Sequence, residues 1–172
     1  MGPVSASVEV DAARERVFDF VADLGNRLAF TDHFVSGFHL SRLDSTGVGA
    51  GARFRFHAAP QAIWVDTVIE RLVRPQGISE RGHGGRANRI PCAIEWEFLA
   101  DAGGLTTVRV VHWTSPTHPL DRAREVLGGA AYWYERNWQI AMRRLRDLLE
   151  SKAALGGRVV VAGGNRHATG VA

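Results

Sequence analysis

The sequence has a single cysteine, Cys92, and no hydrophobic run long enough to cross a bilayer. One cysteine cannot form an intrachain disulfide, which excludes a disulfide-stabilised fold and favours a reducing compartment. A transmembrane helix needs about 18 consecutive apolar residues. The opening Met1-Gly2-Pro3-Val4 also has neither the basic region nor the apolar run of a signal peptide. We therefore expect a cytoplasmic protein without integral membrane association.

Motifs for metal and nucleotide binding are lacking as well. The seven histidines show no metal-ligand spacing with the cysteine or with paired carboxylates, so no metal site is expected. The glycine-rich segment 47–51 resembles a phosphate loop, but a strand-like segment follows it where a dinucleotide-binding loop leads into a helix. We predict a protein without a cofactor.

The sequence lacks an excess of positive charge outside its C-terminal tail, although its pI is about 9.7. Three of the 21 basic residues follow Glu150 and none of the 18 acidic residues does, so the first 150 residues have no net charge. The only lysine is Lys152. A positive excess confined to the C-terminal tail forms no binding face, which argues against a nucleic-acid partner.

The length and composition are those of one globular domain. A chain of 172 residues with 45% apolar residues can bury a sizeable core. We expect a single domain over residues 1–152. Residues 153–172, mostly small or polar, are predicted to be a flexible tail.

The pattern along the chain predicts one strand, two helices, about six antiparallel strands and a long helix. Val4–Val10 alternates as a half-buried strand. Asp11 is suited to cap the first helix, which Gly25 would end, and 26–34 is predicted to be a second short helix. The further predicted strands are 38–43, 53–57, 63–73, 78–81, 92–99 and 106–114.

The last segment, 119–151, is predicted to be a long amphipathic helix that Gly128-Gly129 kinks. Its apolar residues recur every three or four positions, which places them in one stripe. These residues are Leu127, Ala131, Tyr134, Trp138, Ala141, Leu145 and Leu148. Aromatic residues with polar tips in mid-stripe, Tyr134 and Trp138, fit either a cavity lining or ordinary core packing.

Several local sequences resemble the START-related superfamily called SRPBCC, over roughly Ser5 to Leu149. They are the opening VSASVEVDAARERVFDFVADLGNRLAF, the turn GVGAGARFRF, the strand and turn VIERLVRPQGI, and the closing helix. Two departures are Phe30-Thr31-Asp32 in place of a Trp-x-Pro and Arg74-Pro75 in place of a double proline. A turn and an apolar contact remain at these positions.

The resemblance implies an α+β helix-grip fold, in which a seven-stranded antiparallel sheet wraps around a long C-terminal helix and two short helices follow the first strand. Members of this superfamily, which includes polyketide cyclases, lipid-transfer domains and birch pollen allergens, hold lipids, sterols, polyketides or aromatic ligands between sheet and helix. Some catalyse cyclisation or dehydration. They share no common catalytic set, so the fold leaves the function open.

Strand alternation predicts which side chains face that interior. Arg109 marks the solvent face of its strand, and Glu95 and Glu97 mark that of the neighbouring strand. The predicted ligand-binding residues are Phe30, Phe34, Phe54, Phe56, Ile94, Trp96, Phe98, Val108, Val110 and Trp138. The loop 82–86 could gate this interior or be an ordinary surface loop.

Two interior residues could carry chemistry. His112 could act as a general base or bind a ligand oxygen, or be a neutral histidine satisfied by Tyr134 or by backbone. Tyr134 could donate to an enolate or carbonyl, or simply pack in the core. Cys92 has no activating base in the sequence and is expected to be inert.

These observations support two hypotheses of function. The first is a monomeric or homodimeric carrier for a hydrophobic, aromatic, polycyclic or lipid-like small molecule. The second is a polyketide cyclase or aromatase that uses His112 and Tyr134 for proton transfer. A cyclase needs at least two polar groups in an otherwise apolar interior, whereas a carrier needs one or none.

Overall fold

A computed structural model describes residues 1–57, 62–101 and 103–151. The predicted tail, 153–172, lies outside the described residues. The strands are β1 (Val4–Val10), β2 (Val35–Leu40), β3 (Gly51–Phe56), β4 (Ile63–Val73), β5 (Gly77–Gly84), β6 (Ile90–Ala100) and β7 (Thr106–Thr114). The α-helices are α1 (Arg14–Ala22), α2 (Arg27–Thr31), α3 (Pro119–Leu127) and α4 (Ala130–Glu150). Two short 3-10 helices are η1 (Leu24–Asn26) and η2 (Arg86–Asn88).

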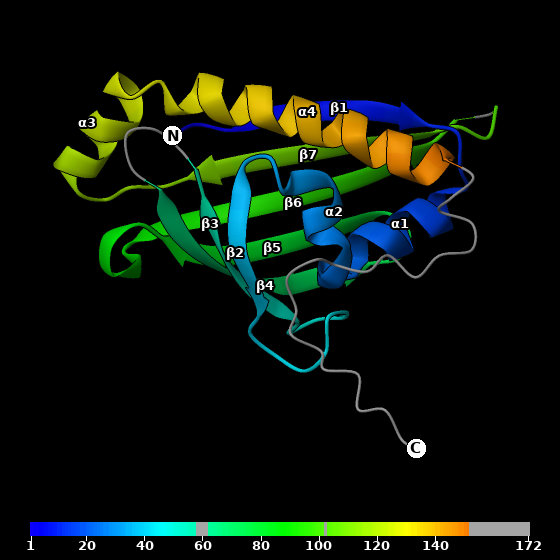
Figure 1. The fold of residues 1–172 in the computed structure, drawn as a ribbon, viewed down its shortest axis with the longest axis horizontal. Coiled ribbons are helices and arrows are strands. Elements are labelled where there is room, and N and C mark those ends of the chain that lie inside the picture. Colours follow the sequence, from blue (N-terminus) through cyan, green and yellow to red (C-terminus); the bar gives the residue numbers. More distant parts are fainter. Residues whose placement is uncertain (58–61, 102, 152–172) are drawn as a thin grey trace, which may run out of the picture.

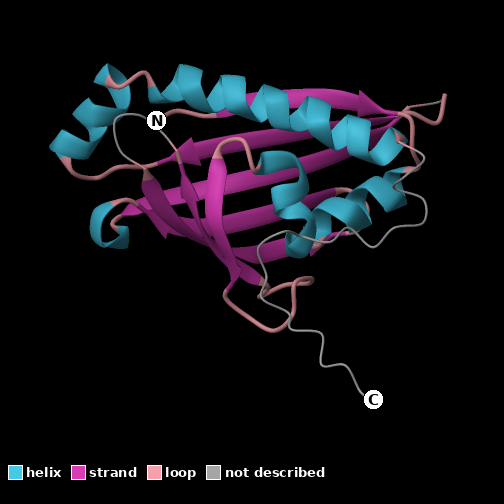
Figure 2. Ribbon diagram, viewed as in Figure 1, coloured by secondary structure: helices cyan, strands magenta, loops and turns pink. Residues whose placement is uncertain are grey.

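The seven strands form one antiparallel sheet in the order β1-β7-β6-β5-β4-β3-β2. The sheet curls around α4, which lies along β1, while α1 and α2 cover another part of the same face (Figures 1 and 2). This confirms the predicted helix-grip fold. Val4 of β1 pairs with His112 of β7, and Ile94 of β6 pairs with His112 on the other side.

The predicted helix over 119–151 is helical on both sides of Gly128-Gly129, where a kink was expected, and it is divided there into α3 and α4. Gly129 adopts a left-handed conformation (φ +63°), which glycine tolerates better than other residues. This conformation interrupts the helix and separates α3 from α4. The predicted stripe holds from Tyr134 onward, and Met142 and Leu149 widen it. Leu127 is 87% exposed and Ala131 is also exposed, so their assignment to the buried stripe is wrong.

Two smaller expectations are also corrected. The first helix begins at Arg14, and its N-cap is Ala13, which offers no side-chain hydrogen bond, rather than Asp11. The glycine segment predicted as a loop from Gly82 continues strand β5 as far as Gly84. A Cβ atom on Gly82 would lie 1.9 Å from the backbone oxygen of Asp66, so only glycine allows β5 to approach β4 this closely.

Candidate functional site

His112 occupies the centre of the interior, on the face of β7 that is turned toward α4. It is 1% exposed, and its Nδ1 accepts a hydrogen bond from the indole Nε1 of Trp138 at 3.3 Å. The ring of Tyr134 lies edge-on at 4.6 Å between centroids, and that of Phe56 is stacked at 5.6 Å. His112 therefore lies on the inner face of β7, as strand alternation predicted.

The contact with Trp138 fixes the protonation state of His112. An indole N–H can only donate, so Nδ1 must accept and the imidazole proton resides on Nε2. Burial lowers the pKa of His112 to about 3, and the nearby N-terminal amine adds to this effect. The imidazole is thus neutral at physiological pH and presents Nε2–H as a donor, which no hydrogen bond found among the described residues uses.

Tyr134 supplies a second donor beside this imidazole. The side chain is 4% exposed, and its ring meets Phe56 edge-on at 5.1 Å. Burial raises the pKa of Tyr134 above its usual value, so the phenol keeps its proton. Two neutral rings that each carry a donor, one from β7 and one from α4, therefore lie in edge-to-face contact in apolar surroundings.

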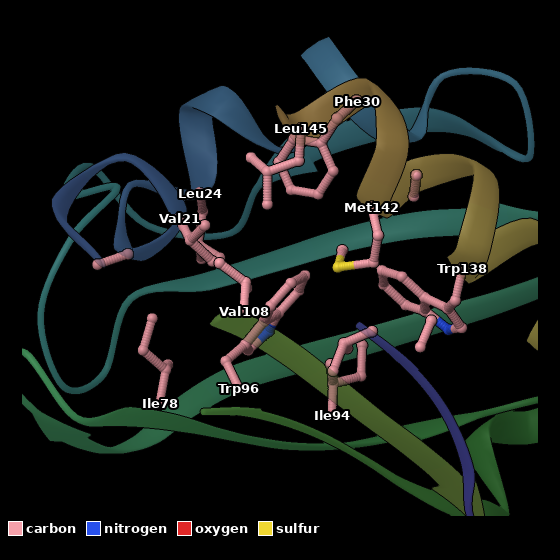
Figure 3. Close-up of a cluster of buried hydrophobic side chains, with 14 of the residues drawn as sticks. Val21, Leu24, Phe30, Ile78, Ile94, Trp96, Val108, Trp138, Met142 and Leu145 are labelled. Atoms are coloured by element: carbon pink, nitrogen blue, oxygen red, sulfur yellow. The ribbon is translucent and has the colours of Figure 1, made fainter. Parts of the chain in front are cut away.

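The residues predicted to line the interior are all buried, but they pack against one another. Each of the ten is at most 3% exposed. Trp138 meets Trp96 at 5.7 Å and Phe34 at 5.2 Å between centroids, and Phe30 meets Trp96 at 6.2 Å. Figure 3 shows Trp138, Met142 and Leu145 of α4 pointing toward Ile94, Trp96 and Val108 of the sheet. Aromatic rings occupy the space between helix and sheet.

A buried ion pair adjoins this aromatic cluster, and the sequence analysis missed it. Arg27 of α2 donates to Glu80 of β5 at 2.6 Å, and their side chains are 4% and 1% exposed. Glu80 also accepts from the indole of Trp96 at 2.9 Å and from the hydroxyl of Thr67 at 3.3 Å. The Arg27 guanidinium lies over the Trp96 ring at 4.9 Å. One carboxylate therefore anchors a helix and an interior tryptophan at once.

A sequence signal for this ion pair did exist. Glu80 has the same alternation as Ile78, which faces inward, so a charged residue at that position needed a partner. The partner was not predictable, because Arg27 lies 53 residues away on a short helix. Local periodicity carries no information about such a contact.

Other candidate groups do not join the interior donors. Burial raises the pKa of the Cys92 thiol to about 12, with Glu80 and Asp66 adding to the effect, so the thiol stays protonated. Two surface depressions, one beside β1 and the C-terminal part of α4 and one on α3, contain none of the predicted site residues. Over residues 1–57, 62–101 and 103–151, none of the helices has the length and hydrophobicity that crossing a bilayer requires.

The sequence profile of a known family matches residues 1–150, which is nearly all of the described chain. The profile is that of polyketide cyclase / dehydrase and lipid transport proteins. The chain belongs to this family.

Solved structures similar to this chain share its fold at low sequence identity. KanY matches with a TM-score of 0.69 at 15% identity, over 88% of this chain and 100% of KanY. A START superfamily protein from Mycobacterium smegmatis matches with a TM-score of 0.56 at 14% identity, over 83% of this chain and 98% of its own.

DynU16, a protein of the dynemicin biosynthetic locus, matches with a TM-score of 0.61 at 20% identity over 88% of this chain. This chain spans only about half (48%) of DynU16. No functionally curated protein matches the sequence.

Proposed function

We propose that this protein binds an aromatic or polycyclic small molecule with a carbonyl-type oxygen, between β7 and α4. The Nε2–H of His112 and the phenol of Tyr134 donate to the ligand oxygen, and the surrounding aromatic rings pack against its apolar body. Family membership supports a ligand-binding or cyclase-type role for this fold.

The observation that carries the proposal is the orientation of the His112 imidazole. Trp138 occupies Nδ1, and this leaves a neutral N–H directed away from that contact in an apolar environment. A ligand oxygen that accepts from this N–H would add the free energy of one hydrogen bond, about 0.5–1.5 kcal/mol. The site therefore favours an oxygenated ligand over a pure hydrocarbon.

Ligand entry requires some of the interior rings to separate. Those rings now contact each other, and their mutual contacts would be exchanged for contacts with the ligand's rings. The aromatic pairs around Phe56, which meets Phe54 and Tyr134 at 5.1 Å each, lie next to His112 and are the first to be affected. Such an exchange buries similar apolar area before and after binding, so the oxygen contact decides which ligand is preferred.

The cyclase hypothesis remains a second candidate on one observation. Two adjacent neutral donors can stabilise the enolate oxygen that forms when a polyketide cyclises. The same geometry disfavours His112 as a general base, because Nδ1 accepts from Trp138 and Nε2 already carries a proton. We therefore place binding first.

Fluorenone and fluorene test the proposal, because these tricyclic probes share a skeleton and differ by one carbonyl oxygen. We expect the wild-type protein to bind fluorenone about tenfold more tightly than fluorene, the contribution of one hydrogen bond in a dry site. His112→Phe should bring the two dissociation constants, measured by fluorescence titration, close to equality. Tyr134→Phe, which removes only the phenol oxygen, should reduce the ratio.

His57→Phe is the matched control, since His57 is exposed at the end of β3. It should leave the fluorenone-to-fluorene ratio at the wild-type value. A ratio unchanged in His112→Phe, or no binding of either probe to the wild-type protein, would contradict the proposal.

A further inference from the structure

Helix α3 is amphipathic, but its orientation is the reverse of that of a core helix. At about 100° per residue, Leu120, Ala123, Val126 and Leu127 fall on one side of the helix, and Asp121 and Glu125 fall on the opposite side. The apolar side is the one in solvent. Leu120 is 61% exposed, Val126 73% and Leu127 87%.

The acidic side of α3 is turned toward the rest of the protein and tied to it. Asp121, 6% exposed, accepts two hydrogen bonds from the guanidinium of Arg89 at 2.7 and 2.9 Å. Glu125 accepts from the hydroxyl of Thr114 at 2.7 Å and also from the N-terminal amine of Met1. These polar contacts hold α3 with its apolar residues outward, an arrangement that hydrophobic burial alone would not produce.

Two arginines flank the exposed apolar stripe. By the same helical spacing, Arg122 and Arg124 lie on either side of it, and both are exposed. The Arg124 side chain is 73% exposed and lies 4.0 Å from Asp121. With its acidic residues turned inward, α3 therefore presents only apolar and cationic groups to solvent. This is the pattern of a helix that lies in the interface of an anionic membrane.

We propose that α3 docks this protein on anionic lipid surfaces, with Val126 and Leu127 entering the interface and Arg122 and Arg124 contacting lipid phosphates. A second copy of the chain fits this helix less well. A helix of nine residues is about 14 Å long and about 10 Å wide. The area of its exposed face is therefore far smaller than the roughly 800 Å² that each partner buries in a stable dimer. A bilayer surface needs no matching partner patch, and its negative charge complements both arginines. The proposal is independent of the interior ligand.

Vesicle flotation tests this docking. The wild-type protein should float with vesicles of 70% phosphatidylcholine and 30% phosphatidylglycerol at low salt, and bind far less to phosphatidylcholine alone. Arg122→Gln/Arg124→Gln should weaken binding to anionic vesicles roughly 25-fold, from about fivefold per arginine. Val126→Ser/Leu127→Ser should weaken it at least tenfold, through the lost apolar burial.

The matched control is Arg42→Gln/Leu43→Ser, which changes an exposed arginine and a fully exposed leucine outside α3. It should float like the wild type. Thermal unfolding should be unchanged in every variant, because all the altered side chains are exposed. Absence of wild-type flotation, or equal flotation of the α3 variants and the control, would overturn the proposal. If the wild-type protein does not bind vesicles but forms a dimer in light scattering, and the α3 variants are monomers, the partner of α3 is a second copy of the chain and the lipid proposal is wrong.

Discussion

Glu80→Ala is expected to lower the free energy of unfolding by about 3–5 kcal/mol, the largest effect that we predict for a charged residue of this protein. The substitution leaves the Arg27 guanidinium buried without a counter-charge, and it removes the acceptor for the indole of Trp96 and the hydroxyl of Thr67. Urea denaturation followed by circular dichroism measures the loss. A single domain has only about 5–15 kcal/mol of stability, so this variant will be close to unfolding.

Glu97→Ala is the matched control, because Glu97 forms a similar pair with Arg109 on neighbouring strands with both side chains 51% exposed. An exposed pair contributes about 1 kcal/mol or less. The double variant Arg27→Met/Glu80→Leu should recover part of the lost stability, since it removes both charges and keeps the volume but leaves the indole of Trp96 without this acceptor. If Glu80→Ala costs no more than Glu97→Ala, the buried ion pair does not have the role described here.

Trp138→Ala is expected to lower the free energy of unfolding by about 3–5 kcal/mol, because it empties a well-packed position between α4 and the sheet. Trp138 is 2% exposed, and its ring contacts Trp96 and Phe34. The variant also removes the hydrogen bond to His112 Nδ1. A tryptophan that merely lined an open cavity would cost much less, so this measurement distinguishes a packed interior from a hollow one.

Trp64→Ala gives the comparison for Trp138→Ala. Trp64 is half-buried on the opposite face of the sheet, under the guanidinium groups of Arg53 and Arg55 at 5.1 and 5.9 Å from its ring. Loss of these cation–π contacts should cost about 1–2 kcal/mol. Equal losses in the two variants would contradict the tight packing of Trp138.

Much of the fold was predictable from local patterns. Alternation along β6 and β7 placed Trp96 and His112 on the inner face, because side chains of a strand point to opposite sides of a sheet. The stripe of α4 was predictable for the same kind of reason. The reversal of α3 was not, because periodicity shows that a helix has an apolar side but does not show which side meets the protein. Contacts with Arg89 and Met1 help to decide that orientation, and both residues are distant from α3 in sequence.

The candidate site was predictable in part. The inward position of His112 followed from its strand, but its tautomer depends on Trp138, which lies 26 residues away on another element. Because of that contact, the imidazole is a hydrogen-bond donor rather than a general base. This favours the binding hypothesis over the cyclase hypothesis. Phe30, Phe34 and Phe56 were expected around a ligand, but the stacking of Phe34 on Phe56 and the edge-on contact of Phe30 with Trp96 became visible only in three dimensions.

The most direct test of this account is a long-range ¹H–¹⁵N NMR spectrum of the histidine side chains. We predict that His112 shows a protonated Nε2 and an unprotonated Nδ1 from about pH 5 to pH 8, without titrating, because burial lowers its pKa to about 3. Addition of fluorenone should shift the Nε2 resonance, and addition of fluorene should leave it nearly unchanged. An His112 that titrates near pH 6.5, or an Nε2 resonance that does not respond to fluorenone, would contradict the proposed site.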